Sequence, residues 1–180
     1  MSTLNDIHVL VVDDNKQMRF LLRSLLRAAG VGRISEAAHA ARAFETMAQT
    51  PIDLLLVDWK MQPVYGLAFT RKVRLAANSP NPYVTILMLT AHTEASRVAA
   101  ARDAGVTGFL KKPISAQLLF DRIGSALTNP RVFVRTQDFF GPDRRFGAMP
   151  GYAGPLRREA DGVMPAADMV DIDDVRWRRA

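Results

Sequence analysis

Short apolar segments that each end in a polar residue constrain the fold of this chain more than any other feature. Runs of this length, bounded by acids or by Gly and Pro, are typical of strands buried on both faces of a parallel sheet. Buried helices would need roughly ten or more residues. The three clearest runs are residues 7–12, 53–57 and 83–89, which are followed by Asp13, Asp58 and Thr90.

Segments with helical periodicity lie between these runs. In residues 16–29, the leucines, Leu21 and Leu22 among them, are predicted to form one buried face, with Asn15 as the N-cap and Gly30 as the stop. The opposite, polar face carries Arg19, Arg23 and Arg27. Further helices are predicted near 40–49, 67–77, 94–104 and 116–127, and weaker strands near 33–37 and 108–110. Five strand–helix units imply parallel strands with helices on both faces. A helical domain is the alternative, which the shortness of the apolar runs disfavours.

Composition narrows the class of protein. The net charge is +6, but no long run of like charge is present, so a solvated mixed surface is expected. The absence of cysteine excludes disulfides, a thiolate nucleophile and zinc held by Cys ligands. No apolar run approaches the roughly 18 residues of a membrane span, and no secretory signal is visible, so a cytoplasmic protein without membrane contact is expected.

Polar residues follow the predicted strands where each strand ends, and parallel strands share one carboxyl edge. Three carboxylates gathered there would repel one another without a counter-charge, which Mg²⁺ would provide. A lysine and a hydroxyl beside them suit a phosphoryl group. The set consists of Asp13, Asp14, Asp58, Thr90 and one lysine of the Lys111–Lys112 pair. It indicates phosphoryl transfer, with a carboxylate as the nucleophile. Nucleotide hydrolysis is not expected, because the chain has no glycine-rich phosphate loop.

Four motifs in this order resemble the receiver domain of bacterial two-component response regulators. They are Val11-Val12-Asp13-Asp14, Leu56-Val57-Asp58-Trp59-Lys60-Met61, Leu89-Thr90-Ala91 and Gly108-Phe109-Leu110-Lys111-Lys112-Pro113. The resemblance covers about residues 5–128. It implies a CheY-like, flavodoxin-like, doubly wound α/β fold with five helices and a five-stranded parallel sheet in the order 2-1-3-4-5.

The resemblance also assigns residue roles. Asp58 would be the phosphoacceptor, taking the phosphoryl group from a phosphohistidine. Asp13 and Asp14 would help to hold Mg²⁺, together with Asp58 and the main-chain carbonyl of Lys60. The sensor histidine kinase or histidine phosphotransfer protein that donates the group would be one partner, and a downstream protein the other.

Three further roles follow from the same resemblance. Lys112 is selected over Lys111 because the family lysine directly precedes proline. Thr90 would bond a phosphoryl oxygen, and Phe109 would reorient as Thr90 moves. The face that changes would be the fourth helix, the fifth strand and the fifth helix, and a homodimer of the chain would form through the same face. The chain departs from the family where Gln62 intervenes before Pro63, in the loop after the acceptor.

Residues 129–180 differ in character from the predicted receiver domain at 1–128. This tail is expected to be extended or partly ordered and mostly irregular, and it has no helix-turn-helix pattern. Two G-P-x-R-R motifs present paired arginines, which would either dock on a partner or belong to a solvated spacer. The four arginines are Arg144, Arg145, Arg157 and Arg158.

The pattern as a whole predicts a response regulator: a phosphoprotein in a phosphorelay that forms an aspartyl phosphate and signals by protein–protein interaction. It is not expected to be a turnover enzyme, because a receiver takes its phosphoryl group once and loses it slowly. A nucleic-acid-binding regulator that uses the arginine-rich tail is the alternative, although no basic helix supports it. A phosphatase-like hydrolase is the third reading.

Overall fold

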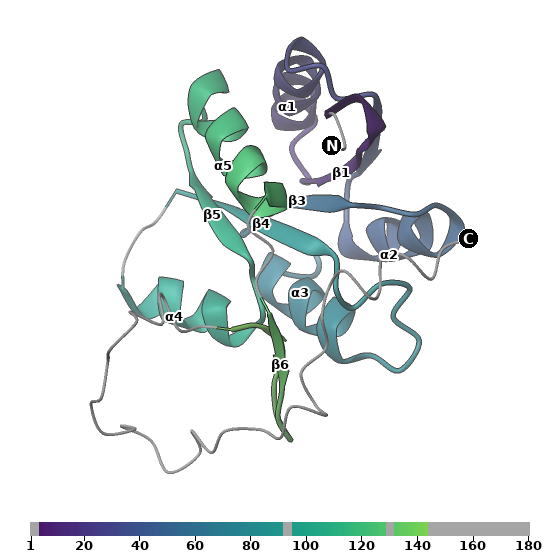
Figure 1. Cartoon of the computed structure of the whole chain (residues 1–180), viewed down its shortest axis with the longest axis vertical. Coiled ribbons are helices and arrows are strands. Elements are labelled where there is room, and N and C mark those ends of the chain that lie inside the picture. The colour runs from purple at the N-terminus through teal and green to yellow at the C-terminus, as the bar shows by residue number, and fades with distance from the viewer. Residues whose placement is uncertain (1–3, 92–94, 129–131, 144–180) are drawn as a thin grey trace.

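The structure, a computed structural model, describes residues 4–91, 95–128 and 132–143 (Figure 1). A short 3-10 helix (Leu4–Asp6) precedes the first strand. Five parallel strands form one sheet in the order β2-β1-β3-β4-β5, which confirms the predicted flavodoxin-like topology. The strands are β1 (His8–Val12), β2 (Arg33–Ala37), β3 (Leu54–Asp58), β4 (Thr85–Thr90) and β5 (Gly108–Lys111). No helix in the described part of the chain is long and apolar enough to cross a membrane.

Helices cover both faces of the sheet (Figure 1). They are α1 (Lys16–Ala28), α2 (Ala40–Gln49), α3 (Gly66–Leu75), α4 (Ala95–Asp103) and α5 (Ala116–Thr128). Because side chains alternate along a strand, each strand contributes to two cores. Leu10, Leu55 and Ile86 pack with α2 and α3, whereas Leu56 and Leu87 pack with α1 and α5.

The ends of α1 follow from local chemistry. The Asn15 side chain accepts hydrogen bonds from the backbone N–H groups of Gln17 and Met18, so it caps the helix as predicted. Gly30 has a φ of +83° and follows the last turn, where glycine has little conformational cost. One prediction for this helix is wrong: Leu21 is 42% exposed, because the surface buried against the sheet is narrower than the leucine stripe.

Residues beyond α5 add a feature that periodicity did not reveal. β6 (Phe133–Arg135) and β7 (Phe140–Pro142) pair as an antiparallel hairpin. The N–H of Thr136 donates to the carbonyl of Phe139 and closes its turn. We call residues 132–143 the C-terminal hairpin. It lies within the segment that was expected to be extended or partly ordered.

The C-terminal hairpin packs on the edge of the molecule where β4 and β5 begin. The rings of Phe133 and Phe140 lie 5.3 and 5.0 Å from the ring of Tyr83, which precedes β4. A Cβ atom on Gly141 would lie 2.8 Å from the Cα of Gly105, which lies in the connection between α4 and β5, so glycine is required at this approach. This edge is opposite the carboxyl ends of the strands.

Arg74 is buried beneath the hairpin. Its Nε donates to the carbonyl of Gly105 at 3.0 Å and its Nη1 to the carbonyl of Pro82 at 2.6 Å. The guanidinium carbon lies 5.0 Å from the centre of the Phe133 ring, a cation–π contact. Burial lowers the pKa of Arg74 to about 9. The hairpin therefore closes over a cation that links α3 to the segments before β4 and β5.

Candidate functional site

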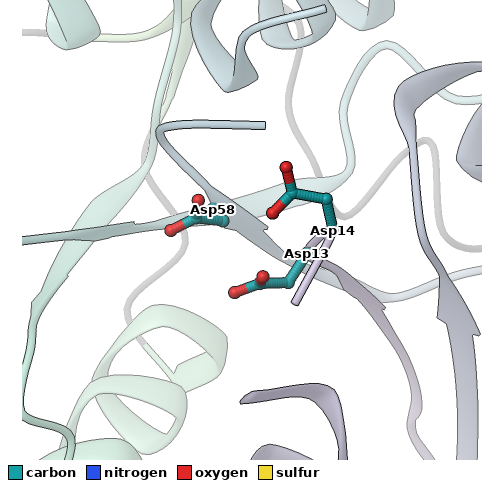
Figure 2. A group of neighbouring side chains, drawn as sticks. All are labelled: Asp13, Asp14 and Asp58. Atoms are coloured by element: carbon teal, nitrogen blue, oxygen red, sulfur yellow. The ribbon is translucent and has the colours of Figure 1, made fainter. Parts of the chain in front are cut away.

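Acidic side chains meet at the carboxyl edge of the sheet, as predicted. Asp13 and Asp14 follow β1 and Asp58 is the last residue of β3. Figure 2 shows the three side chains gathered beside one another, and one carboxylate oxygen from each lies within 4.8 Å of those of the other two. The pairing of β1 with β3, which aligns Val12 with Val57, brings these strand ends together.

Asp58 is held by two donors. Its Oδ1 accepts a hydrogen bond from Lys112 Nζ at 2.7 Å, and its Oδ2 accepts one from the backbone N–H of Lys60 at 2.9 Å. The side chain is mostly buried, with the residue 7% exposed. The following helix comes very close, because a Cβ on Gly66 would overlap with the carbonyl of Asp58. The carboxylate therefore has a fixed orientation and an ammonium group beside it.

Asp13 is buried, with 1% of the residue exposed. Its Oδ1 accepts a hydrogen bond from the N–H of Asn15 at 2.8 Å, whereas no donor in the described part of the chain forms a hydrogen bond with its Oδ2. Lys112 Nζ lies 3.5 Å from that oxygen. Burial raises the pKa of Asp13 above its usual range, and the Asp58 carboxylate adds to this, against the lowering effects of the Asn15 N–H and Lys112.

A buried carboxylate oxygen without a hydrogen bond, beside two other carboxylates, is an arrangement that suits a hard divalent cation. The donor set is oxygen only, which fits Mg²⁺ better than a metal that prefers sulfur or imidazole. Asp14 is exposed, so a cation bound there could keep several water ligands. The residues present therefore fit the predicted cofactor.

The loop that departs from the family pattern contacts this cluster. The backbone N–H of Gln62 donates to Asp14 Oδ2 at 3.1 Å. Gln62 is followed by Pro63 through a cis peptide bond. The additional residue in the loop thus provides a hydrogen-bond donor to one of the candidate metal ligands, a contact that the sequence did not reveal.

Thr90 and Phe109 lie on neighbouring strands of the sheet, β4 and β5. Thr90 is the last residue of β4 and is buried, and its carbonyl accepts a hydrogen bond from the N–H of Lys112 at 2.8 Å. Phe109 is partly buried and packs on the core that includes Met88 of β4. By strand alternation, Thr90 and Met88 face the same side of the sheet as Phe109.

Arg19 contacts the backbone of the acidic residues, a role that the sequence did not indicate. Arg19 in α1 donates from Nη1 to the carbonyls of Asp13 and Asp14, at 2.7 and 3.3 Å. Helical periodicity placed Arg19 on the polar face, and nothing local indicated that β2 would bring Glu36 beside it. The tail arginines Arg144, Arg145, Arg157 and Arg158 lie outside the described residues.

Comparison with known proteins supports the resemblance. Residues 9–124 match the family described as the response regulator receiver domain. The chemotaxis protein CheY of Pseudomonas aeruginosa is 33% identical over 115 residues, which cover 64% of this chain and 91% of that protein. Chemotaxis protein CheY1 of Helicobacter pylori is 32% identical over 116 residues, covering 64% of this chain and 92% of that protein.

Solved structures agree with this result. Chemotaxis protein CheY4 of Vibrio cholerae superposes with a TM-score of 0.61 at 28% identity, covering 66% of this chain and 96% of that chain. A putative response regulator from Chloroflexus aurantiacus gives a TM-score of 0.62 at 28% identity, covering 68% and 99%. Because the family match spans more than half of its residues, this chain belongs to the response regulator receiver domain family.

Proposed function

We propose that the chain accepts a phosphoryl group from a phosphohistidine on the carboxylate of Asp58. Membership of the family supports a response regulator that signals by phosphorylation. The observation that carries the assignment to Asp58 is its position: it ends β3 inside the acidic cluster, with Lys112 Nζ 2.7 Å from Oδ1. In the transfer, a carboxylate oxygen forms a bond to phosphorus, the bond from phosphorus to the histidine nitrogen breaks, and the imidazole leaves with that electron pair.

The other residues at the edge have defined tasks in this proposal. A bound Mg²⁺ would supply neutralising charge for the carboxylates and for the phosphoryl oxygens. Asp13, Asp14 and Asp58, with the main-chain carbonyl of Lys60, would hold it. Lys112 lies close to both Asp58 and Asp13, and its ammonium group would stabilise charge on the transferred group.

The response would run through Thr90 and Phe109. The Thr90 hydroxyl would donate a hydrogen bond to a phosphoryl oxygen. The shift of Thr90 toward that oxygen would make room for Phe109 to reorient. Phe109 has no hydroxyl to hydrogen-bond when it faces water, so its burial would control the equilibrium. The surface changed would be α4, β5 and α5, which would bind a downstream protein or a second copy of the chain.

The output proposed for this chain is protein binding. The match spans 91% of the Pseudomonas aeruginosa chemotaxis protein, so that relative is little more than a receiver. The donor would be a sensor histidine kinase or a histidine phosphotransfer protein in the cytoplasm. The chain itself would be a phosphoacceptor that slowly loses the group, not a turnover enzyme.

Phosphoramidate, a small donor with the same phosphorus–nitrogen bond, tests this proposal. Incubation with Mg²⁺ is expected to add one phosphoryl group per chain, detected by intact mass, with slow release of phosphate afterwards. Chelation of Mg²⁺ should prevent the adduct. Absence of the adduct in the presence of Mg²⁺ would refute phosphoryl acceptance, and rapid multiple turnover of the donor would refute the distinction from an enzyme.

A further inference from the structure

The guanidinium group of Arg19 contacts the backbone of Asp13 and Asp14 from the side of α1. We call these two residues the acidic loop. Arg19 belongs to the first turn of α1, and its side chain is only 15% exposed. Its Nη1 donates to the carbonyl of Asp13 at 2.7 Å and to that of Asp14 at 3.3 Å. Both carbonyls belong to the acidic residues themselves, so one side chain restrains two successive peptide planes.

These two bonds complement the bonds made by the carboxylates. The N–H of Asn15 holds Asp13 Oδ1, and the N–H of Gln62 holds Asp14 Oδ2. Each acid is therefore fixed at its carbonyl as well as at its carboxylate. With the main chain restrained, each carboxylate has fewer directions available, which favours the convergence that a cation requires.

Arg19 is in turn held by Glu36 of β2. The Nε of Arg19 lies 3.3 Å from Glu36 Oε2, and Arg23 Nη1 lies 2.9 Å from Glu36 Oε1. Glu36 thus binds two arginines, but only Arg19 reaches the acidic loop. This difference provides a matched comparison, because loss of either arginine removes one ion pair with Glu36 and only loss of Arg19 removes the carbonyl bonds.

Two effects of Arg19 on a cation oppose one another. Its positive charge repels a bound cation, whereas its hydrogen bonds hold the ligands in place. Glu36 reduces the repulsion by supplying a neighbouring negative charge. The direction in which cation affinity changes when Arg19 is removed therefore tells the two effects apart.

We propose that Arg19 is a positioning residue for the divalent-cation site: through the carbonyls of Asp13 and Asp14 it sets the direction of both carboxylates, and Glu36 fixes Arg19 in turn. This inference deepens the proposed phosphoryl-acceptor function and rests on it. Arg19 would touch neither the cation nor the phosphoryl group, so its positioning effect runs through the two acids.

Mg²⁺ titration of the unphosphorylated full chain by calorimetry tests the proposal without any reaction. Arg19→Met is expected to weaken Mg²⁺ binding about tenfold, the lower end of the range for residues that orient metal ligands. Arg19→Lys keeps the charge but cannot hold both carbonyls in the same planar geometry, so it should lie between Arg19→Met and the wild type. Arg23→Met, the matched control, should stay within about twofold of the wild type, because it removes no bond to the acidic loop.

Other results would overturn the proposal. If Arg19→Met binds Mg²⁺ as tightly as the wild type, or more tightly, the charge of Arg19 dominates and positioning fails. If Arg23→Met weakens binding as much as Arg19→Met, the effect belongs to the ion pair with Glu36 and the carbonyl bonds are irrelevant. Thermal unfolding in the absence of Mg²⁺ must show both methionine variants folded at the titration temperature, and Arg19→Gln replaces Arg19→Met if the latter is not.

Adduct formation separates this proposal from the one on which it rests. In Arg19→Met, the Mg²⁺ concentration for half-maximal phosphorylation by phosphoramidate should rise about tenfold while the rate at saturating Mg²⁺ is retained. A lower plateau with unchanged Mg²⁺ dependence would contradict positioning of the cation ligands. If the wild type binds Mg²⁺ but forms no adduct, the proposal of phosphoryl acceptance fails. The difference in Mg²⁺ affinity between Arg19→Met and Arg23→Met, measured by calorimetry, still decides the role of Arg19.

Discussion

The C-terminal hairpin is expected to stabilise the receiver fold, and Phe140→Ala is the most informative perturbation. Phe140 is buried and lies against Tyr83 in an edge-to-face arrangement. Truncation of a buried phenylalanine to alanine costs about 3–5 kcal/mol. Single domains are stable by about 5–15 kcal/mol, so the loss would be a large fraction of the total.

The contacts of Arg74 should largely survive this substitution. Its cation–π contact is with Phe133, and its hydrogen bonds go to the carbonyls of Gly105 and Pro82. The Phe140→Ala change removes the ring contacts with Tyr83 and Phe133. The decrease should be at least about 3 kcal/mol, the lower end of the range, which corresponds to a fall in Tm of roughly 10 °C for a domain of this size.

Thermal and urea unfolding, followed by circular dichroism, measure this decrease. Val132→Ala is the matched control within the hairpin, because Val132 is 42% exposed and its carbonyl bond to the N–H of Asp143 does not involve the side chain. It should change stability by less than about 0.5 kcal/mol. Chains that end at residue 131 or at residue 143 test the hairpin directly, and the shorter chain should be the less stable of the two.

Two outcomes would refute the reasoning. Equal Tm values for the chains ending at 131 and 143 would mean that the hairpin contributes nothing to the fold. A Phe140→Ala chain as stable as Val132→Ala would mean that the aromatic contacts with Tyr83 do not form in solution.

The remaining predictions concern the site. Asp13→Asn should raise the Tm measured without divalent cations, because it removes a buried charge that repels Asp58. It should also weaken the further stabilisation that Mg²⁺ provides. A lower Tm than that of the wild type without Mg²⁺ would contradict this prediction. The pKa of Asp13 in the folded state is above its usual value of 3.8. At pH values between 3.8 and this higher folded-state pKa, the folded chain therefore binds more protons than the unfolded chain. Without Mg²⁺, the contribution of Asp13 to the free energy of unfolding should therefore decrease as pH rises through that window, a slope that Asp13→Asn should remove in paired urea titrations. Thr90→Ala should still be phosphorylated on Asp58, but hydrogen exchange in α4, β5 and α5 should no longer respond to phosphorylation.

Much of the molecule could be predicted from local pattern. The runs around β1, β3 and β4 were found because strands buried on both faces are continuously apolar, and α1 because Asn15 and Gly30 mark its ends. The convergence of Asp13, Asp14, Asp58 and Lys112 follows from parallel strands sharing one edge. The strand order came from the family resemblance, since residue patterns alone do not say which strands pair.

The features that were missed depend on contacts between distant segments. The strands of the hairpin have three residues each, too few for periodicity, and they are held by Tyr83 and Arg74, which lie far away in sequence. Arg19 looked like one of several arginines on a polar helix face until β2 placed Glu36 beside it. Exposure of Leu21 likewise depends on how α1 is rotated against the sheet.

The central claim is that Asp58 accepts the phosphoryl group. The most direct test is intact mass of wild type and Asp58→Asn after equal incubation with phosphoramidate and Mg²⁺, with Asp138→Asn on the exposed hairpin turn as a control for loss of an unrelated carboxylate. The account predicts one added phosphoryl group on the wild type and on Asp138→Asn, and none on Asp58→Asn. A phosphoryl adduct of the same extent on Asp58→Asn would contradict it.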